Sequence, residues 1–446
     1  MAGVWIALGT VVAVIFLAVL YGLTIRSMYG EKIRTGEVYL VSTPDLWKIR
    51  VCRYRRGRTL GEPVLFCHGA GANHHNFSLP ENESLIDYLM EKGYDCWAVD
   101  LRGCRSSHPP QGKGRFEATL DDYLLHDIPA VIDHICRVTG YQTIHWIGHS
   151  MGGLLLYAYA LEYGPRRIAG AVTLGAPTGF DGAHKAPPRF LVRLFARHPR
   201  LITALAHGYI PIGRALRLPF GVFPVNMRNL HPRITVEHLY VMLDNLIPDV
   251  FVTLAGWMRK RTCLMKAGTL DVKAGLPSLR VPLLMLLAPR DPFLSVEYGW
   301  RFFEALPTAD KKLVALSKEN GCAEDYNHVE MPFSRGARHE VHAPIAAWLA
   351  AHPARRQSGE FRDADGRLVG AAAAALAPHE RIGILSGSSF RHLVEHDAPA
   401  SSMEDAPPAP EDISTADDDQ QAAQTSESAA ETPPDPATQS PPFQTR

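Results

Sequence analysis

The feature that most constrains the fold is a short turn, rich in glycine, between two periodic segments. The apolar run Thr143–Ile147 leads directly into Gly148-His149-Ser150-Met151-Gly152, and the helical, small-residue run Met151–Glu162 follows. A turn this sharp strains its central residue and leaves little room for side chains two positions away, which explains both glycines. The pattern therefore predicts a strand–turn–helix unit that lifts the Ser150 hydroxyl clear of the backbone.

Strand and helix patterns alternate between residues 36 and 353, which we interpret as one domain. The predicted strands are Glu37–Val41, Leu46–Tyr54, Val64–His68, Tyr94–Asp100, Thr143–Gly148, Ile168–Leu174, Val281–Ala288 and Lys312–Leu316. The predicted helices are Leu85–Lys92, Tyr123–Val138, Met151–Glu162, Val296–Leu306 and His339–Ala350. Two early strands followed by β–α alternation predict a mostly parallel sheet with helices on both faces.

The alternation stops within residues 178–277, where the chain is rich in Arg, His, Leu and Pro. Helical patterns lie within this segment at Phe190–His198, Leu201–His207 and Val236–Trp257. Connections inside a compact domain are usually much shorter. We therefore expect residues 178–277 to be a helical insertion.

The N-terminus carries the uncharged apolar run Val4–Ile25. About 20 apolar residues span a bilayer as a helix. A cleaved signal peptide normally has a basic start, and a buried core helix normally has a polar face, so we favour a transmembrane anchor over both alternatives. We place the anchor at residues 1–25. Arg26, Lys32 and Arg34 follow it and favour a cytoplasmic location for the body of the protein.

The C-terminal part of the chain differs from the body in composition and charge. Residues 354–397 are ambiguous, whereas residues 398–446 are mainly Pro, Ala, Ser, Thr, Gln and acidic residues, which predicts a disordered acidic tail. The chain has 46 basic and 46 acidic residues, and its last 50 residues hold 11 acidic and one basic. The remaining 45 basic and 35 acidic residues make the body basic. The zero total hides this asymmetry, so the catalytic motifs described below, and not the average charge, argue against a nucleic-acid-binding protein.

Four segments resemble the α/β-hydrolase superfamily, and the resemblance covers roughly residues 36–353. Pro63–Gly71 resembles the third strand with its His-Gly turn, and Ala98–Gly103 resembles the D-x-R-G turn after the fourth strand. Gly148–Gly152 resembles the nucleophile elbow, and Val281–Asp291 resembles the late strand that ends in the triad acid. The resemblance implies an α/β-hydrolase fold in which residues 178–277 form a helical cap, although an insertion without substrate contact is the alternative.

The resemblance also implies a catalytic triad in the chain order serine, acid, histidine. Ser150 is the candidate nucleophile, Asp291 follows an apolar strand as the candidate acid, and His328 precedes the terminal helix as the candidate base. The alternatives are Asp310 and Asp325 for the acid, and His339 and His342 for the base.

Two backbone N–H groups, those of Ala70 and Met151, are the candidates for the oxyanion hole. Gly69 and His149 are expected to line the substrate site. A metal site at His68, His74, His75 and His149 is an alternative to this assignment. However, no acidic ligand with H-E-x-x-H spacing accompanies them, and the seven scattered cysteines form no C-x-x-C pair, so we expect neither a metal nor another cofactor.

The sequence thus predicts a membrane-anchored serine hydrolase that cleaves carboxylic esters, including lipid esters, through an acyl-enzyme intermediate. The expected partners are an ester substrate and the membrane, without nucleic acid, and the catalytic domain is expected in the cytoplasm. Protein partners cannot be inferred. An acyltransferase with the same triad and a non-catalytic scaffold with this fold are the alternatives.

Overall fold

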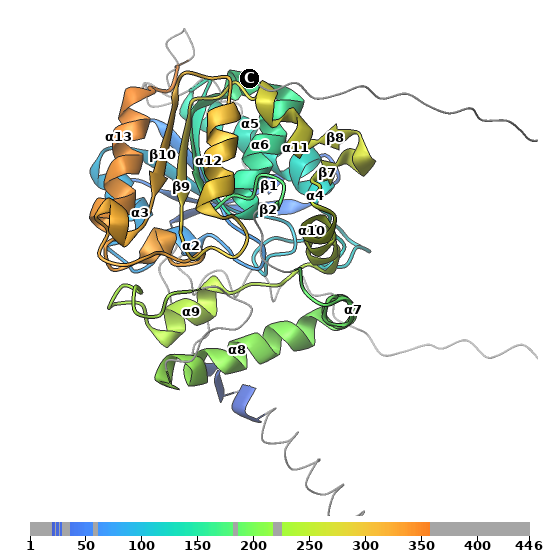
Figure 1. The fold of residues 1–446 in the computed structure, drawn as a ribbon. Helices are drawn as coiled ribbons and strands as arrows, with labels where there is room; N and C mark the ends of the chain where they lie inside the picture. The colour runs from blue at the N-terminus through green and yellow to red at the C-terminus, as the bar shows by residue number, and fades with distance from the viewer. Residues whose placement is uncertain are drawn as a thin grey trace, which may run out of the picture. The chain divides into compact units, whose positions relative to one another are not determined.

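The computed structural model describes residues 20–22, 24–25, 27–28, 36–56, 61–181, 186–216 and 225–356. Within these residues, eight strands form one sheet in the order β1-β2-β4-β3-β5-β6-β9-β10 (Figure 1). They are β1 (Glu37–Ser42), β2 (Lys48–Tyr54), β3 (Pro63–Cys67), β4 (Asp95–Asp100), β5 (Ile144–His149), β6 (Ile168–Leu174), β9 (Leu283–Leu287) and β10 (Lys311–Ala315). Strand β2 pairs antiparallel with β1 and β4, and the other pairings are parallel. The predicted mostly parallel sheet is confirmed.

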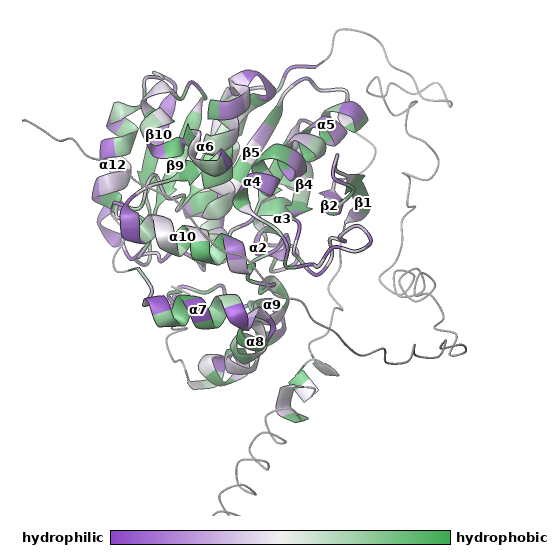
Figure 2. Ribbon diagram, turned by 90° about the vertical axis from the view of Figure 1, so that its right-hand side faces the viewer, coloured by the Kyte–Doolittle hydropathy of each residue, from purple (hydrophilic) through white to green (hydrophobic). Residues whose placement is uncertain are grey.

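Helices cover both faces of the sheet, as predicted. One face packs against α5 (Ile128–Thr139), α6 (Met151–Tyr163) and α12 (Val296–Ala305), and the other against α3 (Leu85–Glu91) and α13 (Ala343–Ala351). Strand β3 shows the pattern, because Leu65 and Cys67 join the first core and Val64 and Phe66 join the second. Figure 2 shows the hydrophobic residues concentrated on the inner strands and the helix faces that meet them. This burial on both faces explains why the central strands are continuously apolar.

Further short elements connect these layers. They are α2 (His75–Ser78), α4 (Leu120–Asp122), the antiparallel pair β7 (Leu264–Met265) and β8 (Leu270–Asp271), and α11 (Val272–Gly275). Of these, α2 bears on function, because it directly follows the loop after β3 and lies against the nucleophile turn.

The insertion contains α7 (Arg189–Arg197), α8 (Pro199–Leu216), α9 (Val236–Met242) and α10 (Pro248–Lys260). Figure 1 shows α7, α8 and α9 beyond one end of the strands, with α10 between α7 and the sheet. A third cluster of buried side chains, including Ile210, Tyr240 and Met242, holds this region together and extends to Phe333. The insertion is therefore packed onto the domain and not merely tethered to it.

The prediction of one helix over Val236–Trp257 is wrong. The helical pattern at Val236–Trp257 is interrupted by an extended segment at residues 243–247, which we call the cap strap. Ile247, with φ −73° and ψ 126°, precedes Pro248 at the start of α10. A residue before proline is disfavoured in the helical region, because the proline ring clashes with its backbone. Pro248 therefore begins a new helix where a continuous one was expected.

Several predicted segments lie outside the described residues. These are residues 1–19 of the predicted anchor, most of the extension 354–397 and the whole of the predicted tail 398–446. In the part of the chain that the structure describes, no helix combines the length and the apolar character needed to cross a bilayer.

Candidate active site

Ser150 lies at the turn between β5 and α6, with φ 53° and ψ −118°. A positive φ is strained for a residue with a side chain and often marks a functional site. Both flanking glycines are needed on steric grounds. A Cβ atom on Gly148 would lie 2.5 Å from the backbone of Gly152, and one on Gly152 would overlap the carbonyl oxygen of Cys67. The tight turn therefore fixes how the Ser150 side chain is presented.

Asp291 and His328 form a buried hydrogen-bonded pair. The Nδ1 atom of His328 lies 2.7 Å from Oδ2 of Asp291, and both side chains are at most 5% exposed. Because a carboxylate only accepts, Nδ1 carries the proton, and Nε2 of the neutral ring keeps its lone pair. The other Asp291 oxygen accepts from the backbone N–H groups of Phe293 (2.8 Å) and Leu294 (3.3 Å). The carboxylate is thus fixed on both sides.

The segments that carry Ser150, Asp291 and His328 meet at the carboxyl ends of neighbouring strands. Ser150 follows β5, Gly175 follows β6 and Asp291 follows β9. A Cβ atom on Gly175 would lie 2.8 Å from the Asp291 carboxylate and 3.0 Å from Nδ1 of His328, so this glycine leaves room for the pair. No hydrogen bond from the Ser150 hydroxyl to any described residue is found. Contacts between nucleophile and base are often long before substrate binds.

The loop after β3 packs against the nucleophile turn. A Cβ atom on Gly69 would lie 3.0 Å from the Cβ atom of Ser150. Met151 begins α6, and the first N–H groups of a helix have no acceptor within the helix. Ala70 and Met151 line one narrow cavity, large enough for about one water molecule. The two candidate oxyanion donors therefore lie beside the same small space.

Each histidine near this loop has a protein partner on at least one ring nitrogen, whereas Nε2 of His74 and Nε2 of His75 have none among the described residues. Nδ1 of His68 lies 2.8 Å from the carbonyl of Gly69, and its Nε2 accepts from the N–H of Leu101 (3.2 Å), so the ring is neutral. Burial disfavours a charge on His74, but the Asp100 carboxylate 2.9 Å away raises the pKa of His74 to about 10. Atoms of His68, Asp100 and Cys104 lie close enough to hold a metal ion. Both nitrogens of His68 already have partners. Burial raises the pKa of the Cys104 thiol well above its usual range. Both side chains are therefore poor ligands for a metal ion.

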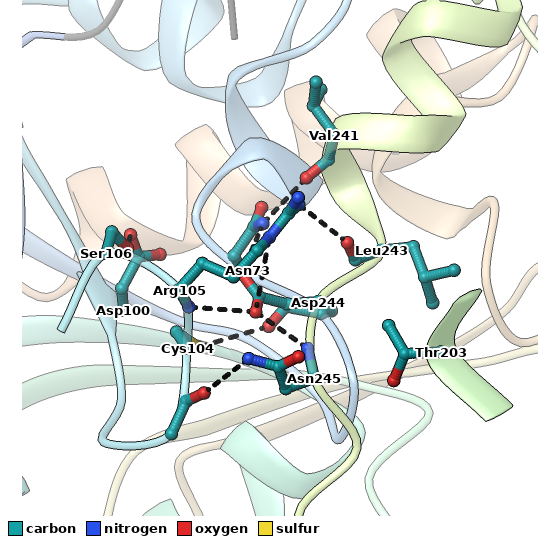
Figure 3. Close-up of polar contacts among 12 residues, drawn as sticks. Asn73, Asp100, Cys104, Arg105, Ser106, Thr203, Val241, Leu243, Asp244 and Asn245 are labelled. Atoms are coloured by element: carbon teal, nitrogen blue, oxygen red, sulfur yellow. Dashed lines mark hydrogen bonds and ion pairs between the residues drawn. The ribbon is translucent and has the colours of Figure 1, made fainter. Parts of the chain in front are cut away.

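The cap strap is hydrogen-bonded to the loop after β3 and to the loop after β4 (Figure 3). Its Asp244 side chain is buried and accepts from Nδ2 of Asn73 (3.0 Å) and from the N–H of Arg105 (3.0 Å). The Asp244 N–H donates to the carbonyl of Gly71 (2.8 Å), and Nη2 of Arg105 donates to the carbonyl of Leu243 (3.0 Å). These bonds connect the insertion directly to the loop after β3 and to the loop after β4.

Apolar side chains of the cap strap and α10 cover the narrow cavity. Leu246, Ile247 and Val250 line it opposite Ala70 and Met151. A Cβ atom on Gly103 would overlap Ile247, which shows how closely the strap approaches the domain. A larger cleft of about 870 Å³ lies over β10 and α12, and its lining contains neither Ser150, Asp291 nor His328. Neither the narrow cavity nor the larger cleft is lined by Asp291 or His328.

The comparison with known families agrees with this arrangement. A family model described as the alpha/beta hydrolase fold matches residues 62–204, which include β3, β4, β5, β6 and the Ser150 turn. Residues 62–204 thus belong to the α/β-hydrolase superfamily. Ser150 lies between a strand and a helix, which is the position of the serine in the nucleophile elbow of this superfamily.

Lipases are among the curated relatives of this chain. Triacylglycerol lipase 2 of Arabidopsis thaliana is 33% identical over 148 residues, which cover 31% of this chain and 35% of that protein. Human gastric triacylglycerol lipase is 34% identical over 130 residues, which cover 26% and 32%. The chain thus spans about a third of the length of these relatives. The structure of a Paleococcus ferrophilus monoacylglycerol lipase aligns with 69% of this chain and 100% of its own, at 19% identity and a TM-score of 0.45.

The alternative acids and bases of this α/β-hydrolase domain have other partners. Asp310 lies 2.8 Å from His352, and Asp325 accepts from the N–H of Lys318. Nε2 of His342 lies 2.8 Å from the carbonyl of Pro332, and burial lowers the pKa of His342 to about 4. His339 borders the larger cleft over β10.

Two polar residues that the sequence analysis did not single out lie close to the candidate site. Asp244 fastens the cap strap, and Asn76 contacts His149. Asn73, which contacts Asp244, lies 171 residues away in the chain, and His149 lies 73 residues from Asn76, so no local pattern reveals these contacts. Pro248 is a signal that could have located the break before α10.

Proposed function

We propose that this protein is a serine hydrolase that cleaves carboxylic esters. The observation that carries the proposal is the strained Ser150 turn beside the buried Asp291–His328 pair. Such a turn presents a hydroxyl to a base, and a carboxylate on Nδ1 leaves Nε2 of the histidine as that base.

In the proposed mechanism, the Ser150 oxygen attacks the carbonyl carbon of the ester while Nε2 of His328 takes the hydroxyl proton. The backbone N–H groups of Ala70 and Met151 stabilise the negative oxygen of the tetrahedral intermediate. As that intermediate collapses, the C–O bond to the alcohol breaks, and His328 gives its proton to the leaving alcohol oxygen. Water then attacks the acyl-enzyme, with His328 again as the base, and releases the acid and free Ser150. Asp291 holds the ring and stabilises its charged form throughout.

Lipid esters are the substrate class that we propose. The curated relatives that are named triacylglycerol lipases support this class, although they match over only about a third of their length. The apolar side chains of Leu246, Ile247 and Val250 beside the candidate oxyanion donors suit an acyl group. We propose that residues 178–277 act as a cap, whose strap must shift to admit a long chain.

An ester panel of increasing acyl length tests this proposal. Wild type should hydrolyse some members of the panel, and Ser150→Ala should lose that hydrolysis. Equal hydrolysis by both proteins would contradict the proposal. Product analysis with an added alcohol acceptor separates hydrolysis from acyl transfer by the same triad.

We further propose that the protein is anchored in a membrane by residues 1–25, with its catalytic domain in the cytoplasm. The described end of this segment contacts the insertion, because the Tyr21 hydroxyl donates to the carbonyl of Gly208 on α8 (3.0 Å). Leu201, Leu205 and Ile212, which share that face of α8, are all exposed. An apolar surface beside the end of an anchor suits contact with lipid.

Helix α7 adds charge to this proposed membrane-facing side. Arg189, Arg193 and Arg197 are exposed around Phe190 and Leu194, and none of them forms an ion pair with a carboxylate of the described residues. Each basic residue near an anionic surface contributes about 1 kcal/mol. Alkaline extraction of membranes tests the anchor: the full chain should stay with the lipid, and a chain without residues 1–19 should be released. Retention of the shortened chain would contradict an anchor formed by this segment alone.

A further inference from the structure

His149, the last residue of β5, has both ring nitrogens engaged by protein groups. Its Nε2 lies 2.8 Å from the backbone carbonyl of His328, and its Nδ1 lies 3.0 Å from Nδ2 of Asn76. A carbonyl can only accept and an amide NH₂ can only donate, so Nε2 carries the proton and Nδ1 accepts. The ring is therefore held as one neutral tautomer. Because the ring is 4% exposed and both of its nitrogens are engaged, neither nitrogen is available to bind a substrate.

The three groups that His149 connects belong to different parts of the site. Asn76 lies in α2, directly after the loop that carries Gly69 and Ala70. His149 itself precedes Ser150, and its second contact is the main chain of the candidate base. One imidazole thus connects three parts of the site. They are helix α2, which follows the loop of Gly69 and Ala70, the turn at Ser150, and the loop that carries His328.

The ring of His149 also packs against the ring of His328. Their centroids are 5.0 Å apart at an interplanar angle of 38°. On another side, Phe293 meets the His328 ring edge-on, with centroids 4.8 Å apart. Together with the Asp291 hydrogen bond, these contacts restrict both the position and the rotation of the candidate base.

Burial favours the uncharged form of the His149 ring. Burial, and secondly the nearby His328 ring, lower the pKa of His149 to about 3. The other titratable group facing it is His68, whose pKa burial also lowers. A neutral ring adds no positive charge beside His328, so it does not oppose protonation of the base during the reaction.

We propose that His149 is a positioning residue. It holds the loop that carries His328, and the loop that carries Gly69 and Ala70, in fixed positions relative to Ser150. The inference rests on the proposed function, since it concerns the same triad. It assigns His149 no proton transfer and no contact with substrate.

A pair of substitutions distinguishes this role from simple packing. Leucine at position 149 fills similar space but makes neither hydrogen bond, whereas glutamine can donate to the His328 carbonyl and accept from Asn76. We expect His149→Leu to lower kcat roughly 10- to 100-fold with little change in KM, because small displacements of a catalytic group cost this much. His149→Gln should restore most of the loss. The acid limb of the kcat/KM profile should keep its position in both variants.

A matched control lies on the same strand. His145 is fully buried in β5 and pairs with Glu62, without contact to the triad. His145→Leu should reduce stability and leave kcat per folded molecule near that of wild type. Thermal unfolding and active-site titration give the folded fraction of each variant.

Two results would overturn the inference. One is a folded His149→Leu protein with kcat within about twofold of wild type, and the other is a His149→Gln protein as slow as His149→Leu. Nitrogen NMR of the wild-type imidazoles gives a readout that does not depend on activity. We expect a neutral His149 with a protonated Nε2 from pH 5 to 9, and a ring that titrates in this range would contradict the inference even if no ester were hydrolysed.

Discussion

The Nδ1 atom of His328 lies 2.7 Å from Oδ2 of Asp291, although the two residues are 37 positions apart in the chain. The bond fixes which nitrogen of His328 carries the proton. It thereby leaves Nε2 as the only ring atom able to take a proton from a hydroxyl. Much of the proposed chemistry depends on this one contact.

The first prediction concerns that contact. Asp291→Asn preserves the shape of the side chain, but its amide can present an NH₂ group to Nδ1 and so favour the wrong tautomer. We expect kcat to fall roughly 10⁴-fold with little change in KM. Steady-state kinetics on a short-chain ester measures both constants. A fall of less than tenfold would show that Asp291 does not set the tautomer.

The second prediction concerns the tight turn at Ser150. A methyl group on Gly152 would overlap the carbonyl of Cys67, so Gly152→Ala must displace backbone from backbone. We expect the free energy of unfolding to fall by on the order of 3 kcal/mol or more. Gly256→Ala in α10 is the control, because a Cβ atom there would meet no neighbouring group of the described residues within 4 Å, and alanine favours helix. Urea unfolding should show destabilisation only for Gly152→Ala.

The third prediction concerns the fastening of the cap strap. Asp244→Ala removes the acceptor of the Arg105 N–H and one of the two acceptors of the buried Asn73 amide, which still donates to the carbonyl of Val241. Each unsatisfied buried donor costs about 1–3 kcal/mol, so we expect clear destabilisation by chemical unfolding. The exposed Asp133, which pairs with Arg167, is the control, and its alanine variant should change stability by less than about 1 kcal/mol. Equal effects of the two substitutions would contradict the fastening role.

The fourth prediction concerns acyl length. Ile247 lines the narrow cavity between Ala70 and Met151. Its truncation in Ile247→Ala should raise the kcat/KM ratio of long-chain to short-chain esters by roughly tenfold or more. Val252→Ala on the exposed side of α10 should leave the ratio unchanged. An unchanged ratio in Ile247→Ala would mean that the acyl group occupies another path.

The fifth prediction concerns pH. The Asp100 carboxylate outweighs burial and raises the pKa of His74 to about 10, whereas the unfolded value is about 6.5. A raised folded pKa means that the stabilisation is fully present below pH 6.5 and is lost as the pH rises toward 10. The stability difference between wild type and His74→Gln should therefore shrink over this window. The contribution of His342 to the pH dependence of stability has the opposite sign. Burial lowers the pKa of His342 in the folded protein to about 4, so this residue reduces stability as the pH falls below 6.5.

The sheet could be predicted from the sequence because its strands are short apolar runs separated by clear helical patterns. The Ser150 turn could be predicted as well, since the glycines at 148 and 152 are needed by local backbone geometry. Pro248 is a local signal for the end of the break at residues 243–247, but the path of the strap is set by Gly71 and Arg105, which are far away in the chain. The contacts of His149 could not be predicted for the same reason. Its neighbours in sequence suggest a position beside substrate, and only the fold brings Asn76 and the His328 carbonyl to its two ring nitrogens.

The most direct test of the central claim is to locate the site of covalent attack. The intact protein would be treated with a fluorophosphonate, digested and analysed by peptide mass spectrometry. The account predicts a single phosphonylated peptide modified at Ser150, with no modification in Ser150→Ala and a much slower reaction in His328→Gln. A folded wild-type protein that stays unmodified, or one modified at another residue, would contradict it.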